Sequence, residues 1–340
     1  MTIRIAVIGA GIMGADHARI VAEDLPGAVL QVVCDMDAAR AAKIADLYGA
    51  QSATDPEAVI ARDDVDAVII ASPDFTHAPL SMACIKAGKK VMCEKPLSQS
   101  SAQCLEVMQA EEASGEKHIM LGFMRRYDPA YLQMRAALHE GKIGRALMLH
   151  NWHRNGSTPA ADFTGAMAIT NSAPHEFDIM RYLLSTEILT ITATQPKRSD
   201  DKVAPVVMVL TTADNQVVTV EVNNNAAYGY DVKAELVGET GSIGTNHVSY
   251  TRLDKDATKS MGHDPDWRDR YAEAYRQQNK AFLKWVKGGD YPERASSSWD
   301  GYAASVIAET GVKALASGNA EPITLTTKPE FYSAHKGADA

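Results

Sequence analysis

At 340 residues the chain is long enough for two domains, because single cores rarely grow beyond roughly 250–300 residues. Hydrophobic residues make up 46% and charged residues 23%, which is ordinary for a soluble globular protein. The formal net charge of −9 argues against nucleic acid or an anionic membrane as a partner. No run approaches the ~20 apolar residues of a membrane span, and a strand pattern already begins at residue 3. We therefore expect a cytoplasmic protein.

The cysteine pattern agrees with a reducing compartment. The four cysteines show no C-x-x-C pairing, and two of them lie in apolar, strand-like runs. We expect buried thiols and neither disulfides nor zinc ligands. The four are Cys34, Cys84, Cys93 and Cys104.

A glycine-rich turn near the N-terminus predicts a dinucleotide site. Residues 3–8 read as a buried strand, and Gly9, Gly11 and Gly14 follow at the spacing G-x-G-x-x-G before a helical segment. The first glycine allows the tight turn, the second lets the backbone approach a pyrophosphate, and the third lets the helix sit close to the strand. Asp35, 21 residues after Gly14 at the end of a second apolar run, would accept hydrogen bonds from the ribose hydroxyls. This acid favours NAD over NADP.

Strands alternate with helices over residues 1–123, which predicts a doubly wound parallel sheet, the Rossmann arrangement. Ligands of such sheets bind at the carboxyl ends of the strands, where the polar segments 72–77 and 94–96 fall. The expected strands are 3–8, 29–34, 66–71, 90–93 and 118–123, with helices starting near 15 and at 37–48, 79–87 and 102–114.

The pattern changes after about residue 125, where several strands follow one another. This predicts a second, α+β domain over residues 124–328, with an open and mostly antiparallel sheet, and a frayed tail over 329–340. Helices can cover only one face of that sheet. The other face needs a cover as well, so we expect a dimer or a homotetramer that forms through it. The expected strands are 146–152, 188–194, 206–212, 216–223 and 231–238, and the expected helices are 127–140, one opening at His175, 267–286 and 299–316.

Several segments together resemble the glucose–fructose oxidoreductase, inositol dehydrogenase and rhizopine-catabolism (Gfo/Idh/MocA) family. The turn Glu94-Lys95-Pro96 ends a strand, the glycine-rich turn precedes it and His175 follows it. The segments 122–129 and 228–232 look most like inositol 2-dehydrogenases, as do 175–184, 270–275 and 300–304. The resemblance covers most of the chain and implies hydride transfer between NAD and a secondary alcohol of a cyclic polyol or sugar.

The resemblance also implies residue roles. Similar enzymes set the lysine of the E-K-P motif against the reacting hydroxyl, and they use a histidine as base with an aspartate four residues earlier. Lys95 and His175 match, but Asn171 stands where the aspartate would be. This departure puts the proton relay in question. His153 and Asn155 match positions that bind the polyol in similar enzymes, and Tyr230 is expected to close the pocket over the ring.

Each role has a plainer alternative. Glu94 is expected to hold its loop rather than react, and proline permits a cis Lys95–Pro96 bond. Arg125 could reach the nicotinamide or a substrate hydroxyl, or form a surface salt bridge. Asp178 is expected to cap a helix. His153 and His175 could instead be metal ligands, but no carboxylate or cysteine stands at ligand spacing, so we expect no metal.

The interpretation is therefore an NAD-dependent inositol dehydrogenase. Asn171 leaves open a dehydrogenase of a sugar, anhydrosugar or glycoside, and a cofactor-binding regulator is the alternative of another class. The expected cofactor contacts are Gly9, Gly11, Ile12, Met13, Gly14, Asp35, Ser72, His77, Glu94, Lys95 and Arg125. The expected substrate contacts are Lys95, Arg125, His153, Asn155, Asn171, His175 and Tyr230.

Overall fold

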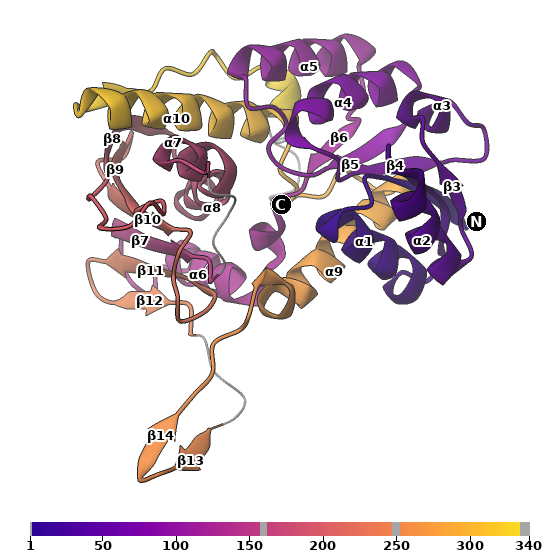
Figure 1. Ribbon diagram of the computed structural model, residues 1–340. Helices are drawn as coiled ribbons and strands as arrows, with labels where there is room; N and C mark the ends of the chain where they lie inside the picture. The colour runs from indigo at the N-terminus through magenta and orange to yellow at the C-terminus, as the bar shows by residue number, and fades with distance from the viewer. Residues whose placement is uncertain (1, 157–161, 247–251, 334–340) are drawn as a thin grey trace. The chain divides into compact units, whose positions relative to one another are not determined.

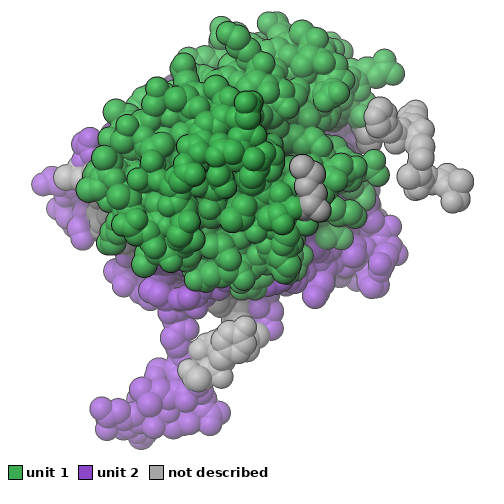
Figure 2. Space-filling model, turned by 90° about the vertical axis from the view of Figure 1, so that its right-hand side faces the viewer, with its two compact units in different colours: residues 1–123, 275–306, 325–340 green, residues 124–274, 307–324 purple. Residues whose placement is uncertain are grey.

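The computed structural model describes residues 2–156, 162–246 and 252–333. The chain forms two compact units (Figure 2). Unit 1 takes residues 1–123, 275–306 and 325–340, and unit 2 takes residues 124–274 and 307–324. The expected second domain ran without a break from 124 to 328. The division into units differs from it, because residues 275–306 pack with the first 123 residues.

Unit 1 holds a six-stranded parallel sheet with the order β3-β2-β1-β4-β5-β6, so the predicted doubly wound sheet is confirmed (Figure 1). Its strands are β1 Ile3–Ile8, β2 Ala28–Cys34, β3 Gln51–Ala53, β4 Ala67–Ile70, β5 Lys90–Cys93 and β6 Ile119–Leu121. Its helices are α1 Ile12–Arg19, α2 Ala38–Tyr48, α3 Pro56–Ile60, α4 His77–Lys86 and α5 Ser101–Ser114, together with parts of α9 and α10. Strand β3 and helix α3 were not predicted. The three residues of β3 lie at the sheet edge with largely exposed side chains, so they carry no apolar pattern.

Sequence signals explain where these elements begin and end. Asp37 caps α2, because its side chain accepts hydrogen bonds from the N–H groups of Ala39 and Arg40. Gly49 ends the same helix with φ +66°, a conformation that glycine adopts without a Cβ penalty. The four cysteines are buried, and none of them forms a disulfide.

The C-terminal segment does not start to fray at residue 329. Residues Glu330–Tyr332 form a 3₁₀ turn, and the Tyr332 hydroxyl donates to the carboxylate of Glu111 at 2.7 Å. Glu111 is fully buried and also accepts from the Ser298 hydroxyl at 2.7 Å and from the His118 N–H at 2.8 Å. The ammonium of Lys117 lies 3.6 Å from the ring centroid of Tyr332. These contacts anchor the segment, and only residues 334–340 of the expected tail fall outside the described part of the chain.

The ammonium of Lys117 makes the stability of the folded chain change with pH in the alkaline range. Burial lowers the pKa of Lys117 to about 8 from its ordinary value of 10.5, although Glu111 opposes the change. Between these two pKa values the unfolded chain binds a proton that the folded chain does not, so the free energy of unfolding rises with pH across this window. Below the window Lys117 is protonated in both states, and the full free-energy cost of burying its charge lowers the stability of the fold. We expect Lys117→Met to raise Tm at pH 7 and to flatten the dependence of Tm on pH from 8 to 10.5, measured by differential scanning fluorimetry. An unchanged dependence would contradict this account.

Unit 2 is built on a seven-stranded sheet with the order β12-β11-β7-β10-β9-β8-β15 (Figure 1). Among the strand pairs of its described residues only β7–β10 is parallel, so the expected mostly antiparallel sheet is confirmed. The strands are β7 Ala146–Arg154, β8 Ile188–Thr194, β9 Val206–Thr212, β10 Val217–Asn223, β11 Asp231–Gly238, β12 Ser242–Gly244 and β15 Glu321–Pro322. A separate hairpin joins β13 Leu253–Lys255 to β14 Thr258–Ser260. The helices are α6 Pro129–His139, α7 Gly165–Met167, α8 Pro174–Leu184 and parts of α9 Trp267–Val286 and α10 Ser298–Ser317.

The two faces of this sheet differ in exposure. On β9 the side chains of Val206, Met208 and Leu210 are fully buried, whereas Val207 and Val209 between them are 39% and 40% exposed. Alternation of this kind places the core on the inner face and leaves an apolar outer face. Within the described residues, no helix is both long and apolar enough to cross a membrane.

Candidate active site

The glycine turn between β1 and α1 has the geometry that its spacing predicts. Gly9 has φ +96°, and an added Cβ would lie 2.4 Å from the carbonyl oxygen of Ala71. A Cβ on Gly14 would lie 1.8 Å from the carbonyl oxygen of Gly9, so only glycine lets the helix approach this closely. A Cβ added to Gly11 would meet nothing within 4 Å. The turn is therefore closed on the sheet side and open where a pyrophosphate would approach the backbone.

The start of α1 leaves backbone donors for an anion. Gly11 is the N-cap residue and makes no side-chain capping bond, so the first N–H groups of the helix lack that partner. Ile12 is 69% exposed and Met13 is half-buried. An exposed isoleucine on the first turn of a helix suits a surface that a ligand covers.

Asp35 is held at the end of β2 by backbone groups. Its Oδ2 accepts from the N–H of Ala10 at 2.8 Å, and its Oδ1 accepts from the N–H of Asp37 at 2.9 Å. The guanidinium of Arg40 lies 3.6 Å away. The carboxylate is thus fixed beside the glycine turn, the place that a ribose contact requires.

The turn Glu94-Lys95-Pro96 follows β5, and its Lys95–Pro96 bond is cis, which proline permits. The Glu94 carboxylate accepts from the Lys95 N–H at 3.2 Å, and Gly122 leaves room for it, since a Cβ there would lie 2.7 Å from Glu94 Oε2. Glu94 therefore holds the turn, as expected. Lys95 is half-buried whereas Glu94 and Pro96 are buried, so the lysine is the member of the turn that reaches solvent.

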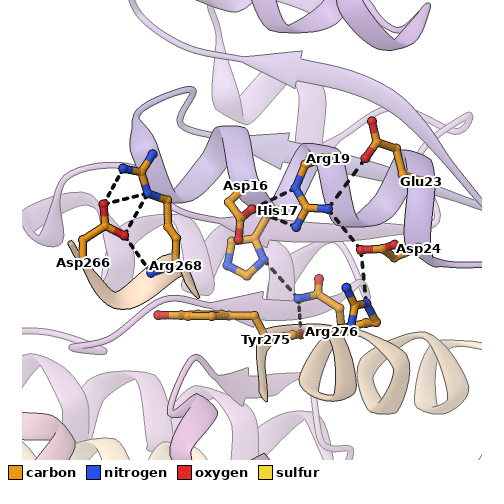
Figure 3. A network of polar contacts seen from close by, with 10 residues as sticks. Asp16, His17, Arg19, Glu23, Asp24, Asp266, Arg268, Tyr275 and Arg276 are labelled. Carbon is orange, nitrogen blue, oxygen red and sulfur yellow. Dashed lines mark hydrogen bonds and ion pairs between the residues drawn. The ribbon is translucent and has the colours of Figure 1, made fainter. Parts of the chain in front are cut away.

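Behind the turn lies His17 of α1, which is fully buried. Its Nδ1 lies 3.2 Å from the amide nitrogen of Asn279, which can only donate, so Nδ1 accepts. The proton must then be on Nε2, which donates to Glu94 at 3.0 Å. Figure 3 shows His17 above Tyr275 of α9, with the two rings edge to face and their centroids 6.0 Å apart. Helix α9 thus supports Glu94 through the histidine.

On its other side the turn is held by His77, which is 1% exposed. The ring nitrogens of His77 lie 2.7 Å from the carbonyl oxygen of Pro96 and 2.8 Å from that of Ser72. Both partners are acceptors, so both nitrogens carry protons and the ring is an imidazolium. Burial by itself lowers the pKa of His77, but Cys93 and Pro96 raise it to about 10. The ring ties together the loops after β4 and β5 and leaves no nitrogen for a cofactor. The Ser72 hydroxyl pairs with that of Thr76 at 2.6 Å.

Unit 2 contains a second, separately formed polar cluster around Glu176 of α8. Glu176 is fully buried, and one of its oxygens is paired with the guanidinium of Arg125. The other oxygen lies 2.9 Å from Nδ1 of His153, on β7. Arg125 is 1% exposed, so the expected alternative of a surface salt bridge is wrong. Its guanidinium lies 5.7 Å from the ring centroid of Tyr271 and 3.2 Å from His153 Nδ1.

Ring contacts bring two of the remaining predicted residues of unit 2, His175 and Tyr230, close to the residues of this cluster. His175 is the second residue of α8, and its ring centroid is 6.4 Å from that of His153. Tyr230 is buried edge-on against Tyr271, with centroids 6.4 Å apart. Asn155 and Asn171 are half-buried, and the Asn171 oxygen accepts from the hydroxyl of Thr170 at 2.9 Å. Among the described residues no group of three or more histidine, cysteine or acidic side chains could hold a metal ion.

Comparisons with known proteins identify the family. Residues 3–123 match an oxidoreductase family with an NAD-binding Rossmann fold, and residues 131–244 match the GFO/IDH/MocA C-terminal domain. The chain belongs to this family. As a Gfo/Idh/MocA protein it is an NAD-dependent oxidoreductase, and the glycine turn and Asp35 belong to its NAD-binding part.

Its relatives are similar over the whole length. "Inositol 2-dehydrogenase 2" of Saccharopolyspora erythraea is 42% identical, with 98% of this chain and 99% of that protein covered. Inositol 2-dehydrogenase of Pseudomonas syringae is 38% identical, with 98% and 100% covered. The crystal structure of myo-inositol dehydrogenase from Lactobacillus casei with NAD(H) and myo-inositol superposes with a TM-score of 0.92 at 29% identity, covering 98% of this chain and 100% of that one.

Sequence reasoning missed several supporting residues of this Gfo/Idh/MocA chain. His17 and Asn279 are 262 positions apart, and no local pattern links them. Glu176 directly follows His175, but nothing in the sequence brings it to His153. Asp178 was expected to cap a helix, which is wrong, because its carboxylate forms a buried two-point ion pair with Arg126, at 2.6 and 2.9 Å. A buried acid in an apolar helical stretch is the signal that could have suggested such pairs.

The cofactor assignment predicts a nucleotide preference. Asp35→Ala removes a hydrogen-bond acceptor and a charge that repels a 2′-phosphate, so we expect the ratio of kcat/KM for NAD to that for NADP to fall about tenfold or more. Initial rates with both cofactors measure this ratio. Asp37→Ala, which removes a neighbouring exposed acid, is the control and should leave the ratio nearly unchanged. Equal use of NAD and NADP by the unaltered protein would overturn the role of Asp35.

Proposed function

We propose that this chain oxidises a secondary hydroxyl of an inositol, or of a closely related cyclic polyol, to the ketone while reducing NAD. The observation that carries this proposal is similarity along the full chain, at 42% identity, to a protein named as an inositol 2-dehydrogenase. Family membership supplies the reaction type, and each unit by itself contains side chains with chemistry suited to an alcohol substrate.

Three tasks have to be performed on the alcohol. NAD, when bound, accepts the hydride. An ammonium at the reacting oxygen stabilises the charge that develops there, and we assign this to Lys95, the solvent-reaching member of a turn fixed by Glu94 and His77. A histidine accepts the hydroxyl proton, and the residues available for this are His175 and His153.

The polar side chains of unit 2 suit a polyol. A cyclic polyol presents hydroxyl groups around its ring, so its pocket needs hydrogen-bonding side chains at several positions. We propose that Asn155, Asn171 and Tyr230 contact hydroxyls other than the reacting one. Arg125 has its guanidinium committed to Glu176, so we propose that it supports His153 rather than binding the substrate.

A substrate panel tests the proposal. The protein is incubated with NAD and inositol stereoisomers, sugars, anhydrosugars or glycosides, and NADH is followed by absorbance. We expect the highest kcat/KM with an inositol. A sugar or glycoside with a higher value would favour the alternative substrate class that Asn171 leaves open. NAD binding by calorimetry without turnover of any alcohol would replace the dehydrogenase with a cofactor-binding regulator.

We also propose that the chain assembles as a dimer or homotetramer through the outer face of the unit 2 sheet, and that it works in the cytoplasm. The outer face exposes Leu189, Val207 and Val209 at 39–48%, an apolar surface suited to the same face of a second copy. Four buried thiols that form no disulfide fit a reducing compartment. Light scattering after size-exclusion chromatography should give a multiple of 36.7 kDa, and Val207→Glu with Val209→Glu should lower it. A monomeric unaltered protein would overturn the assembly.

A further inference from the structure

The turn that carries Lys95 is fixed through the carboxylate of Glu94, which is only 6% exposed. Its Oε2 accepts from the Lys95 N–H at 3.2 Å, and its Oε1 lies 3.0 Å from Nε2 of His17. Gly122 lies against the same group, because a Cβ added there would be 2.7 Å from the carboxylate carbon. The position of this buried carboxylate therefore depends on the partners of both its oxygens.

Asn279 of α9 determines which nitrogen of His17 carries the proton. Asn279 Nδ2 donates to the carbonyl oxygen of Tyr275 at 2.9 Å, and a carbonyl can only accept, which fixes the orientation of the amide. The same NH₂ group lies 3.2 Å from His17 Nδ1, so Nδ1 is the accepting nitrogen. The proton is then on Nε2, which donates it to Glu94.

The imidazole of His17 has little freedom to leave this position. It is fully buried, and the Tyr275 ring meets it edge to face with centroids 6.0 Å apart. Helix α9 is itself fastened to the sheet of unit 1, because Gln278 donates to the carbonyl oxygen of Leu121 at 3.1 Å. The N–H of Leu121 in turn donates to the carbonyl oxygen of Ser296 at 2.9 Å. The histidine is thus a fixed donor behind the turn.

The loss of this donor would have a specific consequence for the lysine. Oε1 of Glu94 would remain buried without its hydrogen bond, which is costly. The carboxylate would turn towards another donor, and the ammonium of Lys95 belongs to the adjacent residue. A bond between an ammonium and a carboxylate is stronger than one between neutral groups. It would hold the ammonium on Glu94 and away from a substrate oxygen.

We infer that His17, oriented by Asn279, is a positioning residue for Lys95. It occupies one oxygen of Glu94, so the carboxylate holds the backbone of the turn and does not capture the Lys95 ammonium. The inference rests on the proposed function, in which this ammonium acts at the reacting oxygen. Protein partners occupy both nitrogens of His17, so the ring transfers no proton in the reaction.

Two substitutions of His17 separate this role from general support of the fold. Glutamine can place an N–H group where Nε2 stands and keep the bond to Glu94, whereas asparagine is too short to reach it. We expect His17→Asn to lower kcat about tenfold or more while the Kd of NAD changes little. His17→Gln should keep kcat within a few-fold of the unaltered value. Equal losses of kcat in the two variants would overturn the inference.

A double variant tests whether Glu94 captures the lysine. Glu94→Gln removes the charge of the carboxylate, and a neutral amide binds an ammonium less strongly. If capture causes the loss of activity, His17→Asn combined with Glu94→Gln has a higher kcat than His17→Asn alone. A double variant whose kcat is equal or lower would contradict the inference, because the loss would then come from an unsupported turn.

Gln278→Leu is the matched control. It removes a fully buried amide from the neighbouring residue of α9, but this amide contacts Leu121 rather than His17. We expect its kcat to remain within a few-fold of the unaltered value. A loss as large as that of His17→Asn would mean that kcat responds to any change in α9, and the specific role of His17 would be refuted.

A measurement on the unaltered protein does not depend on activity. Nitrogen-15 NMR of labelled histidine distinguishes the two neutral tautomers, and the signal missing from His17→Gln identifies His17. We expect the Nε2-protonated form at neutral pH. The Nδ1-protonated form or an imidazolium would overturn the inference whatever the kinetics show. An unaltered protein that turns over no polyol would refute the proposed function instead and would leave the NMR result standing.

Discussion

Lys95→Ala lowers kcat by about 10²-fold or more while NAD binding changes little. The reason is that the ammonium interacts most strongly with the oxygen when negative charge develops there, so its removal raises the barrier more than it weakens ground-state binding. The turn itself should persist, because Glu94 receives the backbone N–H of residue 95 and His77 binds the carbonyl of Pro96. Steady-state kinetics gives kcat, and titration calorimetry gives the Kd of NAD.

Lys90→Ala is the matched control for this prediction. Lys90 begins the same strand, and its ammonium donates to the carbonyl of Trp285, away from the turn. We expect its kcat to remain within a few-fold of the unaltered value. A Lys95→Ala protein with nearly normal kcat and only a raised KM would reduce Lys95 to a substrate-binding residue.

Arg125→Met lowers the free energy of unfolding by about 3–5 kcal/mol and Tm by roughly 10 °C. The substitution leaves the fully buried Glu176 carboxylate without its guanidinium partner, and a buried charge without compensation is costly. The double variant Arg125→Met with Glu176→Gln removes both charges, so it should recover much of the loss. Denaturant titration of the three proteins measures this.

A partly exposed ion pair provides the comparison. Arg154 and Glu221 form a similar two-point contact at 2.6 and 2.7 Å, but their side chains are 25% and 23% exposed. Arg154→Met should cost about 1 kcal/mol or less, because water replaces the lost partner. If Arg125→Met and Arg154→Met lowered the free energy of unfolding equally, burial would not determine the free-energy cost of breaking an ion pair in this protein.

The sequence predicted those features that depend on local periodicity or on a single conformational requirement. Strands β1 and β5 are short apolar runs, and Gly9 and Gly14 stand where any side chain would collide with backbone. Strand β3 was not predicted, because it is an edge strand that pairs with β2 through backbone hydrogen bonds. Polar residues can form such bonds as well as apolar residues can. Periodicity cannot distinguish such an edge strand from a loop.

The sequence predicted which residues belong to the candidate site, but it did not predict which side chains they contact. Lys95, His153 and His175 were found from motifs. The contacts of Glu176 were not, because ion pairs between α8, β7 and the segment after β6 depend on how these elements pack, which the sequence does not encode locally. The alternative of a surface salt bridge for Arg125 was wrong for the same reason. A guanidinium can reach many partners, and burial decided which one it met.

The composition of unit 1 has a consequence for how the chain is made. A ribosome that has synthesised residues 1–123 has produced all the strands of the parallel sheet. It has not yet produced Asn279, the partner of His17, or Ser298 and Tyr332, which complete the bonding of Glu111. Until those residues emerge, the nascent domain exposes polar groups that later become buried and a sheet edge that Ser296 later joins at Leu121. Contacts this distant in sequence close slowly, so the first domain to be translated is among the last parts to finish folding.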